Sequence, residues 1–302
     1  MHSTNMPTRI DASGFWPRLS SPGGGSTVQL STSEDAAEAL AFLTSRPVHT
    51  VNLRGFIRDN GLNSPLNRGS FYGYRNAAGL LEGVALIGHA TLVETRTDRA
   101  LEALARKAQE FSNSHMIMGE QERIEEFWNY YSEDGQQKRL ACRELLFELR
   151  SVVETQSEVQ ALRLATLDNL ELILPVQAAM AEAESGVNPL VKDPEGFRRR
   201  CARRIEQGRT WVLVEDDKLI FKTDVLAETP EVIYLEGIYV SREQRAKGHG
   251  LRCLSQLSQT LLQRTSVLCL LVNEENVTAH AFYRKAGFKS TSTYDTIFLQ
   301  QD

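Results

Sequence analysis

The sequence has no long apolar run, and this absence excludes proteins that span a membrane by a helix. Its longest strongly apolar stretch runs from Val267 to Val272, far shorter than the roughly 20 residues that a spanning helix needs. Residues 1–30 also lack the continuous apolar segment of a secretory signal. We therefore expect a cytoplasmic protein with no membrane partner.

Cysteine is scarce, and no charge of one sign dominates. The four cysteines, Cys142, Cys201, Cys253 and Cys269, lie far apart and form no CxxC pair, so the pattern indicates neither a disulfide framework nor a zinc site. The histidines show no ligand spacing either, and we expect no metal. With 34 Lys and Arg against 39 Asp and Glu the net charge is -5, which argues against nucleic acid as the main partner.

The length favours two domains. A chain of 302 residues is near the size at which one hydrophobic core stops growing. The first thirty residues are rich in Gly, Pro and Ser and cannot bury enough apolar surface to offset their ordering entropy. We predict a flexible tail over residues 1–32, an accessory α/β domain over residues 33–153 and a second domain over residues 160–302.

The first domain is predicted to mix strands and helices. Residues Phe71 to Arg75 and Leu80 to His89 predict two strands of a hairpin, joined by a turn rich in Asn, Ala and Gly. Residues Arg99 to Phe111 carry one apolar stripe and predict a helix. The charge-rich segment Gln137 to Val153 is helix-like and is expected to lead into the second domain.

The second domain is predicted to alternate strands and helices, which requires at least one parallel strand pair. Together the two halves predict a mixed α/β (α+β) sheet, and the chain shows no internal repeat at the residue level. The expected strands and helices of its later part are Thr210 to Glu215, Lys218 to Leu226, Val232 to Val240, helix Gly250 to Gln263, Ser266 to Val272, helix Val277 to Ala286, and Tyr294 to Leu299.

A loop of the form R-x-x-G-x-G, Arg245 to Gly250, follows the third of these strands. The start of a helix offers free N–H groups and the positive end of the helix dipole, so such a turn binds phosphate oxygens. A dinucleotide fingerprint would need a third glycine where the chain has Cys253. An ordinary turn between a strand and a helix is the alternative interpretation.

A second group of residues lies further along the chain. Asn276, Ala279 and Tyr283 share one face of the last predicted helix, and Gly287 stands at the left-handed position that ends it. Taken singly, Asn276 is explained as a helix cap and Tyr283 as a core aromatic residue. The combination of this helix with the loop favours a functional interpretation.

Residues 162–299 resemble a GNAT-superfamily acyl-CoA-dependent N-acyltransferase, through the order of elements, the loop Arg245 to Gly250 and the segment Asn276 to Phe288. The first half resembles the N-terminal domain that precedes the catalytic domain in some bacterial two-domain GNAT proteins. Residues 46–50, 55–61 and 69–74 carry that resemblance. Its order of elements is compatible with a smaller, degenerate copy of the same fold.

The GNAT resemblance implies acetyl-CoA as co-substrate and a site for it in the second domain. The strand Ile238, Tyr239 and Val240 would pair with the pantetheine amides, Asn276 would hold the pantetheine arm, and Tyr283 would protonate the departing thiolate. The pyrophosphate would be bound by backbone N–H groups of Arg245, Ala246, Lys247, Gly248, His249, Gly250 and Leu251.

The resemblance defines the general base less closely than it defines the acetyl-CoA site. Glu236 is the only carboxylate in the strand before the loop, and it shares a face with Tyr234 and Ile238. Many relatives carry their glutamate where this chain has Tyr234. A structural or substrate-binding role for Glu236, with proton removal through water, therefore stays open.

We accordingly predict an N-acetyltransferase that uses direct attack by a small-molecule or protein amine in a ternary complex, because neither motif contains a cysteine for a covalent intermediate. Two alternatives are a non-catalytic acyl-CoA sensor and a tRNA-dependent aminoacyl transferase. The arginine-rich helix Phe197 to Gln207 is either a solvated face or an electropositive flank for the second alternative. A homodimer is also left open.

Overall fold

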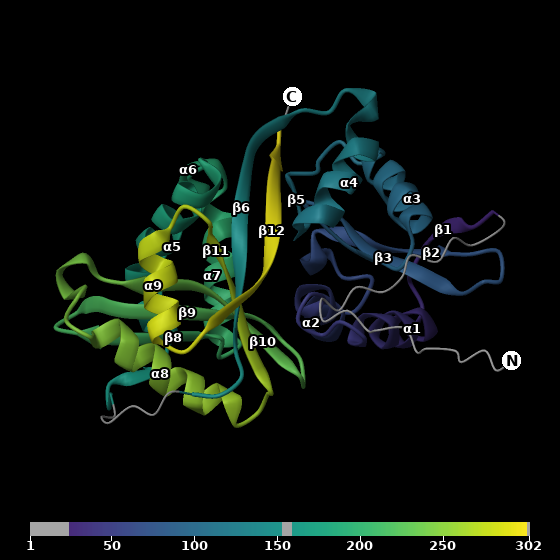
Figure 1. Cartoon of the computed structure of the whole chain (residues 1–302). Coiled ribbons are helices and arrows are strands. Elements are labelled where there is room, and N and C mark those ends of the chain that lie inside the picture. The colour runs from purple at the N-terminus through teal and green to yellow at the C-terminus, as the bar shows by residue number, and fades with distance from the viewer. Residues whose placement is uncertain (1–23, 153–158, 301–302) are drawn as a thin grey trace, which may run out of the picture.

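One mixed sheet of 12 strands runs through the described part of the chain. The computed structural model describes residues 24–152 and 159–300. The strand order is β1-β2-β3-β4-β5-β12-β6-β11-β10-β9-β8-β7, so the first half of the chain supplies one side of the sheet and the second half the other (Figure 1).

Each half follows the same order of elements: a strand, helices, three strands, a helix, a strand, a helix and a last strand. The first half comprises β1 (Ser26–Gln29), α1 (Ser33–Thr44), α2 (Val51–Asn60), β2 (Gly69–Arg75), β3 (Leu81–Gly88), β4 (Ala90–Thr95), α3 (Asp98–Gln109), β5 (Met116–Glu120), α4 (Gln121–Tyr131) and β6 (Lys138–Leu149). The second comprises β7 (Leu162–Leu164), α5 (Leu170–Ser185), α6 (Pro189–Lys192), α7 (Pro194–Glu206), β8 (Thr210–Glu215), β9 (Lys218–Glu228), β10 (Val232–Val240), α8 (His249–Leu262), β11 (Val267–Asn273), α9 (Val277–Lys285) and β12 (Lys289–Leu299). The first half is therefore a topological copy of the second, apart from the single extra turn α6.

The two halves exchange their last strands at the centre of the sheet. β6, from the first half, pairs antiparallel with β11 of the second half, and β12, from the second half, pairs antiparallel with β5 of the first. β6 and β12 also pair with each other along most of their length. Each half thus completes its part of the sheet with a strand of the other (Figure 1).

The predicted helix-like segment Gln137 to Val153 is wrong, because residues 138–149 form strand β6. Leu146 and Phe147 are adjacent in sequence, yet they belong to cores on opposite faces of the sheet. This alternation is what a central strand buried on both faces requires.

The start of the ordered chain also differs from the prediction. Residues 26–29, expected within a flexible tail, form β1 and pair with β2. Thr32 then caps α1 by accepting a hydrogen bond from the N–H of Asp35. Residues 1–23 of the predicted tail, and residues 153–158 between the predicted domains, lie outside the described residues.

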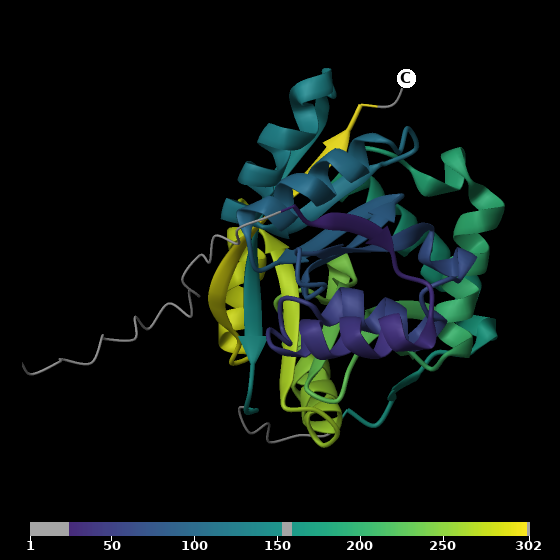
Figure 2. The ribbon, with the colours of Figure 1, turned by 90° about the vertical axis from the view of Figure 1, so that its right-hand side faces the viewer.

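Helices cover both faces of the sheet. In the first half α1 and α2 lie on one face and α3 and α4 on the other, as the view in Figure 2 shows. α2 also packs on the second half, where a Cβ at Gly55 would lie 2.7 Å from the Cβ of Ala227. The buried Arg54 donates to Glu231 at 2.6 Å beside this contact. The halves therefore share a core as well as two strands.

Candidate functional site

Strands β10 and β11 separate part of the way along the sheet. We call this separation the second fork because it lies in the second half of the chain; the corresponding separation of β4 and β5 in the first half is the first fork. Strands β10 and β11 pair in parallel only from Val232 to Tyr234 and from Val267 to Cys269. Beyond Tyr234, β10 continues along β9, whereas β11 continues along β6. The backbone of β10 at Ile238, Tyr239 and Val240 therefore does not pair with β11.

A bulge shapes β10 just beyond the fork. The register with β9 shifts between Glu236 and Tyr239, and Gly237 has a φ of 62°. A Cβ at Gly237 would lie 2.8 Å from Nζ of Lys222, so this position needs glycine for both its conformation and its space.

The loop from Arg245 to Gly250 leads from β10 into α8 and leaves N–H groups without a protein acceptor. Gly248, with a φ of 84°, is the N-cap of α8, and no side chain caps this helix. The N–H groups of the first turn therefore have no intrahelical partner. A Cβ at Gly248 would meet no atom within 4 Å, whereas one at Gly250 would lie 2.6 Å from Cγ2 of Val240. Gly248 thus borders open space, and Gly250 lets the helix approach β10.

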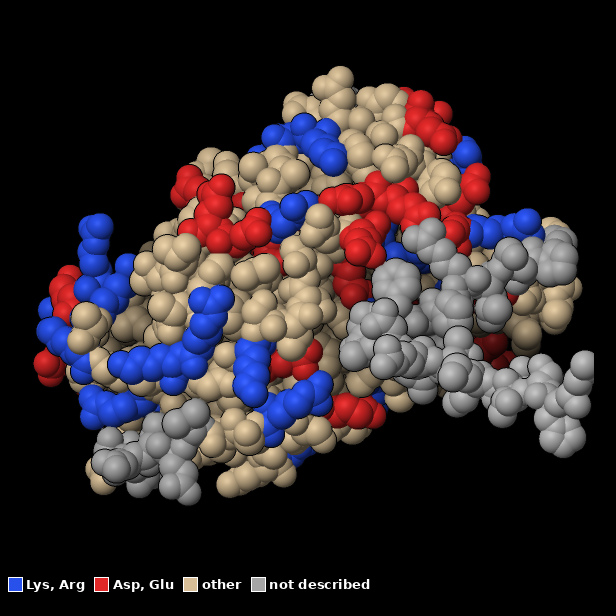
Figure 3. Space-filling model, viewed as in Figure 1, with Lys and Arg blue, Asp and Glu red and all other residues tan. Residues whose placement is uncertain are grey.

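Positive charge accompanies this turn. The exposed Arg245 donates through Nε to the carbonyl of Val240 at 3.1 Å, and Lys247 is also exposed. On the face in Figure 3, Lys and Arg side chains gather toward the lower left, the part of the view in which Figure 1 places α8 and α9, and Asp and Glu prevail above them. Anionic groups are therefore favoured at the turn.

Helix α9 carries Asn276, Ala279 and Tyr283, the second group of residues selected from the sequence. It follows β11, the other arm of the fork. Asn276 is its N-cap, and its Oδ1 accepts a hydrogen bond of 3.1 Å from the N–H of Ala279. The amide nitrogen of this exposed side chain has no hydrogen-bond partner among the residues that the structure describes. Tyr283 is only 9% exposed and packs against Phe147 and Phe288.

The Tyr283 hydroxyl has no hydrogen-bond partner among the residues that the structure describes. Burial raises the pKa of Tyr283, and the nearby Glu184 carboxylate raises it further. The hydroxyl is accordingly a protonated donor at neutral pH, which is the state that an acid for a departing thiolate requires.

Glu236 lies two residues beyond the fork and belongs to a network of charges. Its Oε1 is 3.4 Å from Nη1 of Arg204, and the same nitrogen is 2.9 Å from Oδ2 of Asp224. Asp224 also lies 2.5 Å from Nζ of Lys222, which is fully buried. Burial alone would raise the pKa of Asp224, but the Lys222 and Arg204 cations outweigh it and hold that pKa below its usual range.

The arginine-rich helix α7 uses most of its guanidinium groups within the chain. Arg198 pairs with Glu171, Arg200 with Asp193, Arg203 with Asn60, and Arg204 with the network just described. Arg198, Arg199 and Arg200 are exposed, so α7 does present a solvated face, and its internal ion pairs make that face less than a continuous free cationic surface.

Two carboxylates that the sequence analysis did not select also lie at the fork. Glu144 stands on β6, opposite Asn273 of β11, and burial raises its pKa. Glu184 lies in the last turn of α5, and loss of hydration, followed by the charges of Glu236 and Glu144, raises its pKa to about 7. No local motif marks either residue, because each comes from an element outside the loop and α9.

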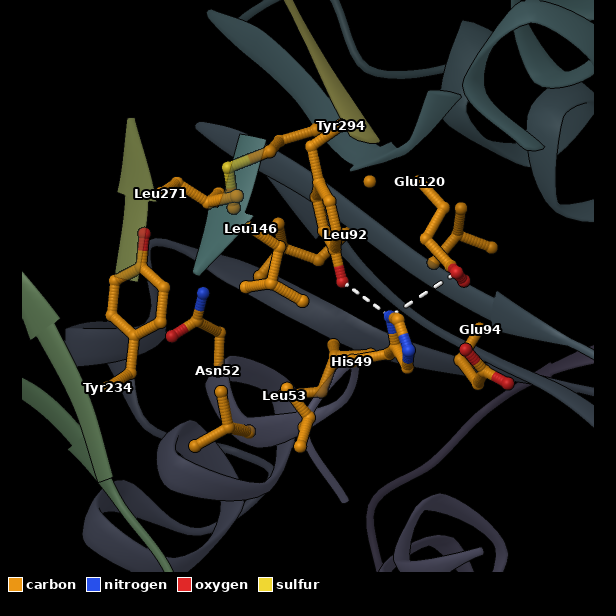
Figure 4. Close-up of a pocket in the computed structure, with 15 residues that line it drawn as sticks. His49, Asn52, Leu53, Leu92, Glu94, Glu120, Leu146, Tyr234, Leu271 and Tyr294 are labelled. Carbon is orange, nitrogen blue, oxygen red and sulfur yellow. Dashed lines mark hydrogen bonds and ion pairs between the residues drawn. The ribbon is translucent and has the colours of Figure 1, made fainter. Parts of the chain in front are cut away.

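The first half contains a corresponding fork between β4 and β5, which pair in parallel only over Ala90–Leu92 and Met116–Met118. A pocket with about 510 Å³ of empty volume, solvent at its mouth included, adjoins this first fork. Figure 4 shows His49 pointing into it, with Nδ1 2.9 Å from the Tyr294 hydroxyl and 3.3 Å from Glu120. Between β4 and α3 the chain passes through only two residues, so the first fork has no counterpart of the loop from Arg245 to Gly250.

A mixed sheet with a fork beside an uncapped helix N-terminus is compatible with the class of acyl-CoA-dependent acyltransferases that the sequence analysis named. The family model described as Acetyltransferase (GNAT) family matches residues 178–288. Residues 178–288 therefore form a GNAT-family domain, and this match supports an acyl-CoA N-acyltransferase.

Solved structures similar to this chain extend the agreement in fold to both halves. A GNAT-family acetyltransferase from Colwellia psychrerythraea has a TM-score of 0.57 at 14% identity, with 92% of this chain and 100% of that chain covered. A tandem GNAT protein from the clavulanic acid biosynthesis pathway has a TM-score of 0.57 at 12% identity, over 91% and 98% of the chains. A Drosophila protein has a TM-score of 0.63 at 12% identity, over 92% and 99%. No curated protein matches.

Within residues 24–152 and 159–300, no helix has the length and apolar character to cross a membrane. The same residues contain no group of three or more His, Cys, Asp or Glu side chains arranged to hold a metal ion.

Proposed function

We propose that this protein transfers an acetyl group from acetyl-CoA to a primary amine in the cytoplasm, by direct attack in a ternary complex at the second fork. The observation that carries the proposal is the free edge of β10 next to the uncapped start of α8. An extended pantetheine chain can add to such an edge by backbone hydrogen bonds, and the turn favours a pyrophosphate.

The residues at the fork fit the co-substrate by shape as well as by charge. Even a Cβ added to Gly248 would leave 4 Å clear of neighbouring protein atoms, so the backbone from Arg245 to Leu251 can approach phosphate oxygens. Asn276 retains amide N–H groups for the pantetheine arm. A backbone N–H in the segment 238–240 would polarise the thioester carbonyl, and Tyr283 would supply the proton for the thiolate.

The domain assignment belongs to the same proposal: residues 160–302 carry the chemistry, and residues 33–153 support it without a co-substrate of their own. The two alternatives, an acyl-CoA sensor and a tRNA-dependent aminoacyl transferase, have less support. The open turn beside the protonated Tyr283 favours an enzyme over a sensor, and the internal partners of the α7 arginines reduce the cationic surface that a tRNA would need.

Calorimetric titration with acetyl-CoA, beside CoA and NAD, tests the proposal. We expect affinity in the micromolar range for acetyl-CoA and CoA and no binding of NAD. A panel of diamines, polyamines, amino sugars and amino acids then identifies the acceptor by release of CoA. Absence of CoA binding, or binding without transfer to any amine of the panel, would reject the proposed activity.

A further inference from the structure

The bulge in β10 reverses the alternation of side chains just beyond the second fork. Two residues of β10, Gly237 and Ile238, stand opposite one residue of β9, Thr223. Leu235 and Ile238 both pack in the core that includes α8, whereas a regular strand would place residues three apart on opposite faces. The prediction that Ile238 shares a face with Glu236 is therefore wrong, because the bulge sets the direction of the backbone groups that follow it.

A buried cation contacts the carbonyl of this bulge. Lys222 lies on β9 and is fully buried, and its Nζ is 3.4 Å from the carbonyl oxygen of Gly237. The same nitrogen donates to Oδ2 of Asp224 at 2.5 Å and to Oε1 of Gln177 on α5. An ammonium group has three N–H bonds, and these three acceptors use all of them. Asp224 and Gln177 thus hold the ammonium group where it reaches the bulge.

The contact with Lys222 fixes the plane of one peptide unit. The C=O of Gly237 and the N–H of Ile238 belong to the same planar trans peptide, so they point in opposite directions. A carbonyl directed at Nζ of Lys222 therefore directs the N–H of Ile238 away from it. A cation at the carbonyl oxygen also polarises the peptide and makes its N–H a stronger donor. This N–H belongs to the segment of β10 that does not pair with β11.

We propose that Lys222 is a positioning residue of the acyl transfer: it binds the carbonyl of Gly237 and thereby holds the N–H of Ile238 toward the thioester carbonyl. This inference rests on the proposed function, in which a backbone N–H of residues 238–240 polarises that carbonyl, and it names the N–H. The thioester oxygen gains negative charge as the amine attacks, and a donor of fixed orientation stabilises that charge without reorganisation. The C–N bond forms and the C–S bond breaks, and no proton passes through Lys222.

A purely structural role for the buried ion pair makes a different prediction. Removal of one partner of such a pair is strongly destabilising, whereas replacement of both by neutral groups is often tolerated. The double variant Lys222→Met with Asp224→Asn removes both charges. Its asparagine can still accept from Arg204 and donate to the hydroxyl of Thr210, the other two partners of Asp224. The double variant therefore keeps the fold but leaves the carbonyl of Gly237 without its cation.

The test compares the full-length wild type with the double variant by kinetics and by infrared spectroscopy. With the best acceptor of the amine panel, the double variant should lower kcat by about 10²-fold and leave the KM for acetyl-CoA and the melting temperature unchanged. With acetyl-CoA labelled with ¹³C at the thioester carbonyl, binding to the wild type should shift the carbonyl band to lower frequency, and the double variant should lose that shift. Lys218→Met is the matched control, because Lys218 is an exposed lysine of the same strand, and it should match the wild type in both measurements.

A second variant keeps the inference testable if the double variant does not fold. Gly237→Ala places a Cβ 2.8 Å from Nζ of Lys222 and displaces the ammonium group from the carbonyl, so the band shift should again be lost and kcat should fall. A wild-type kcat or an unchanged band in either folded variant, or no band shift in the wild type, would overturn the role of Lys222. A wild-type protein that binds acetyl-CoA with the band shift but acetylates no amine of the panel would overturn the proposed function instead.

Discussion

The GNAT half should not fold alone when the chain is cut at the domain boundary predicted from the sequence. A fragment of residues 160–302 lacks β6, the strand that pairs with β11 on one side and with β12 on the other. In this fragment β11 would present one unpaired edge, and β12, whose partners are β5 and β6, would have no partner strand. Exposed edges of this kind promote aggregation.

The magnitude follows from the side chains that β6 buries. Leu146, Phe147 and Leu149 are 2%, 0% and 1% exposed. Burial of each such side chain contributes about 1.5–3 kcal/mol, so their removal costs about 5–9 kcal/mol. A whole domain is stable by only about 5–15 kcal/mol. Loss of β6 is therefore sufficient to unfold the fragment.

Three chains test this prediction: the full-length protein, residues 160–302, and residues 136–302, which regain β6. Circular dichroism should show a cooperative thermal transition for the first and third chains only. Calorimetric titration should show acetyl-CoA binding by the same two chains only. A cooperative transition together with micromolar binding by residues 160–302 would refute the reasoning, because it would mean that β6 is dispensable.

Substitutions and a change of pH test other parts of the molecule. Gly248→Asn keeps the left-handed backbone accessible but places a side chain in the open space of the turn, so calorimetry should show acetyl-CoA affinity at least about tenfold weaker at an unchanged melting temperature. Tyr283→Phe should lower kcat by about 10²-fold without changing acetyl-CoA affinity, and an unaltered kcat would remove Tyr283 from the mechanism. Lys222→Met leaves Asp224 buried without its nearest cation and should lower the free energy of unfolding in urea by about 3–5 kcal/mol; a loss below about 1 kcal/mol would contradict the structural role of the pair. Burial lowers the pKa of His89 to about 3 in the fold, against about 6.5 in the unfolded chain, so its contribution is complete above pH 6.5 and stability should fall by about 2 kcal/mol on going to pH 5. The variant His89→Gln should show a smaller loss over the same pH range.

The sequence was informative where the evidence for an element is local. Residues Arg245 to Gly250 combine a strand end, two glycines and a helix start within a short stretch, and residues 276–288 combine a cap, a helical face and a terminating glycine. Such local patterns can be recognised without knowledge of the rest of the fold. The predicted strands at 210–215 and 232–240 agree with β8 and β10 for the same reason.

Strand β6 could not be predicted from its own residues. The segment Lys138–Leu149 is composed mainly of Leu, Glu, Arg, Lys and Ala, which are good helix formers. Its conformation is imposed by β11 and β12, whose residues follow more than a hundred positions later. The tertiary ladder on both edges overrides the local preference. The prediction of a helix there failed because the partner strands belong to the other half of the chain.

The carboxylates of the site show the same limit. Glu236 was selected because it stands in the strand that leads to the loop, whereas Glu144 and Glu184 come from β6 and α5. Their relevance depends on proximity and on loss of hydration, neither of which is encoded in the residues beside them.

A comparison of the two forks gives a physical reason to propose the ligand site in the second fork. Glu94 stands two residues beyond the last parallel pair of the first fork, as Glu236 does in the second. Arg46 joins Glu94, at 3.2 Å, to Glu120, at 2.6 Å, on the opposite arm.

In the second fork Arg204 joins Glu236 to Asp224 instead, and Asp224 lies on β9, on the side of β10 away from β11. The arginine bridge therefore ties the two arms of the first fork together, whereas it leaves the arms of the second fork apart. The position of one carboxylate relative to its arginine therefore distinguishes the first half from the half to which we assign the binding site. The supporting half in turn supplies β6, and with it Glu144, to the site that remains open.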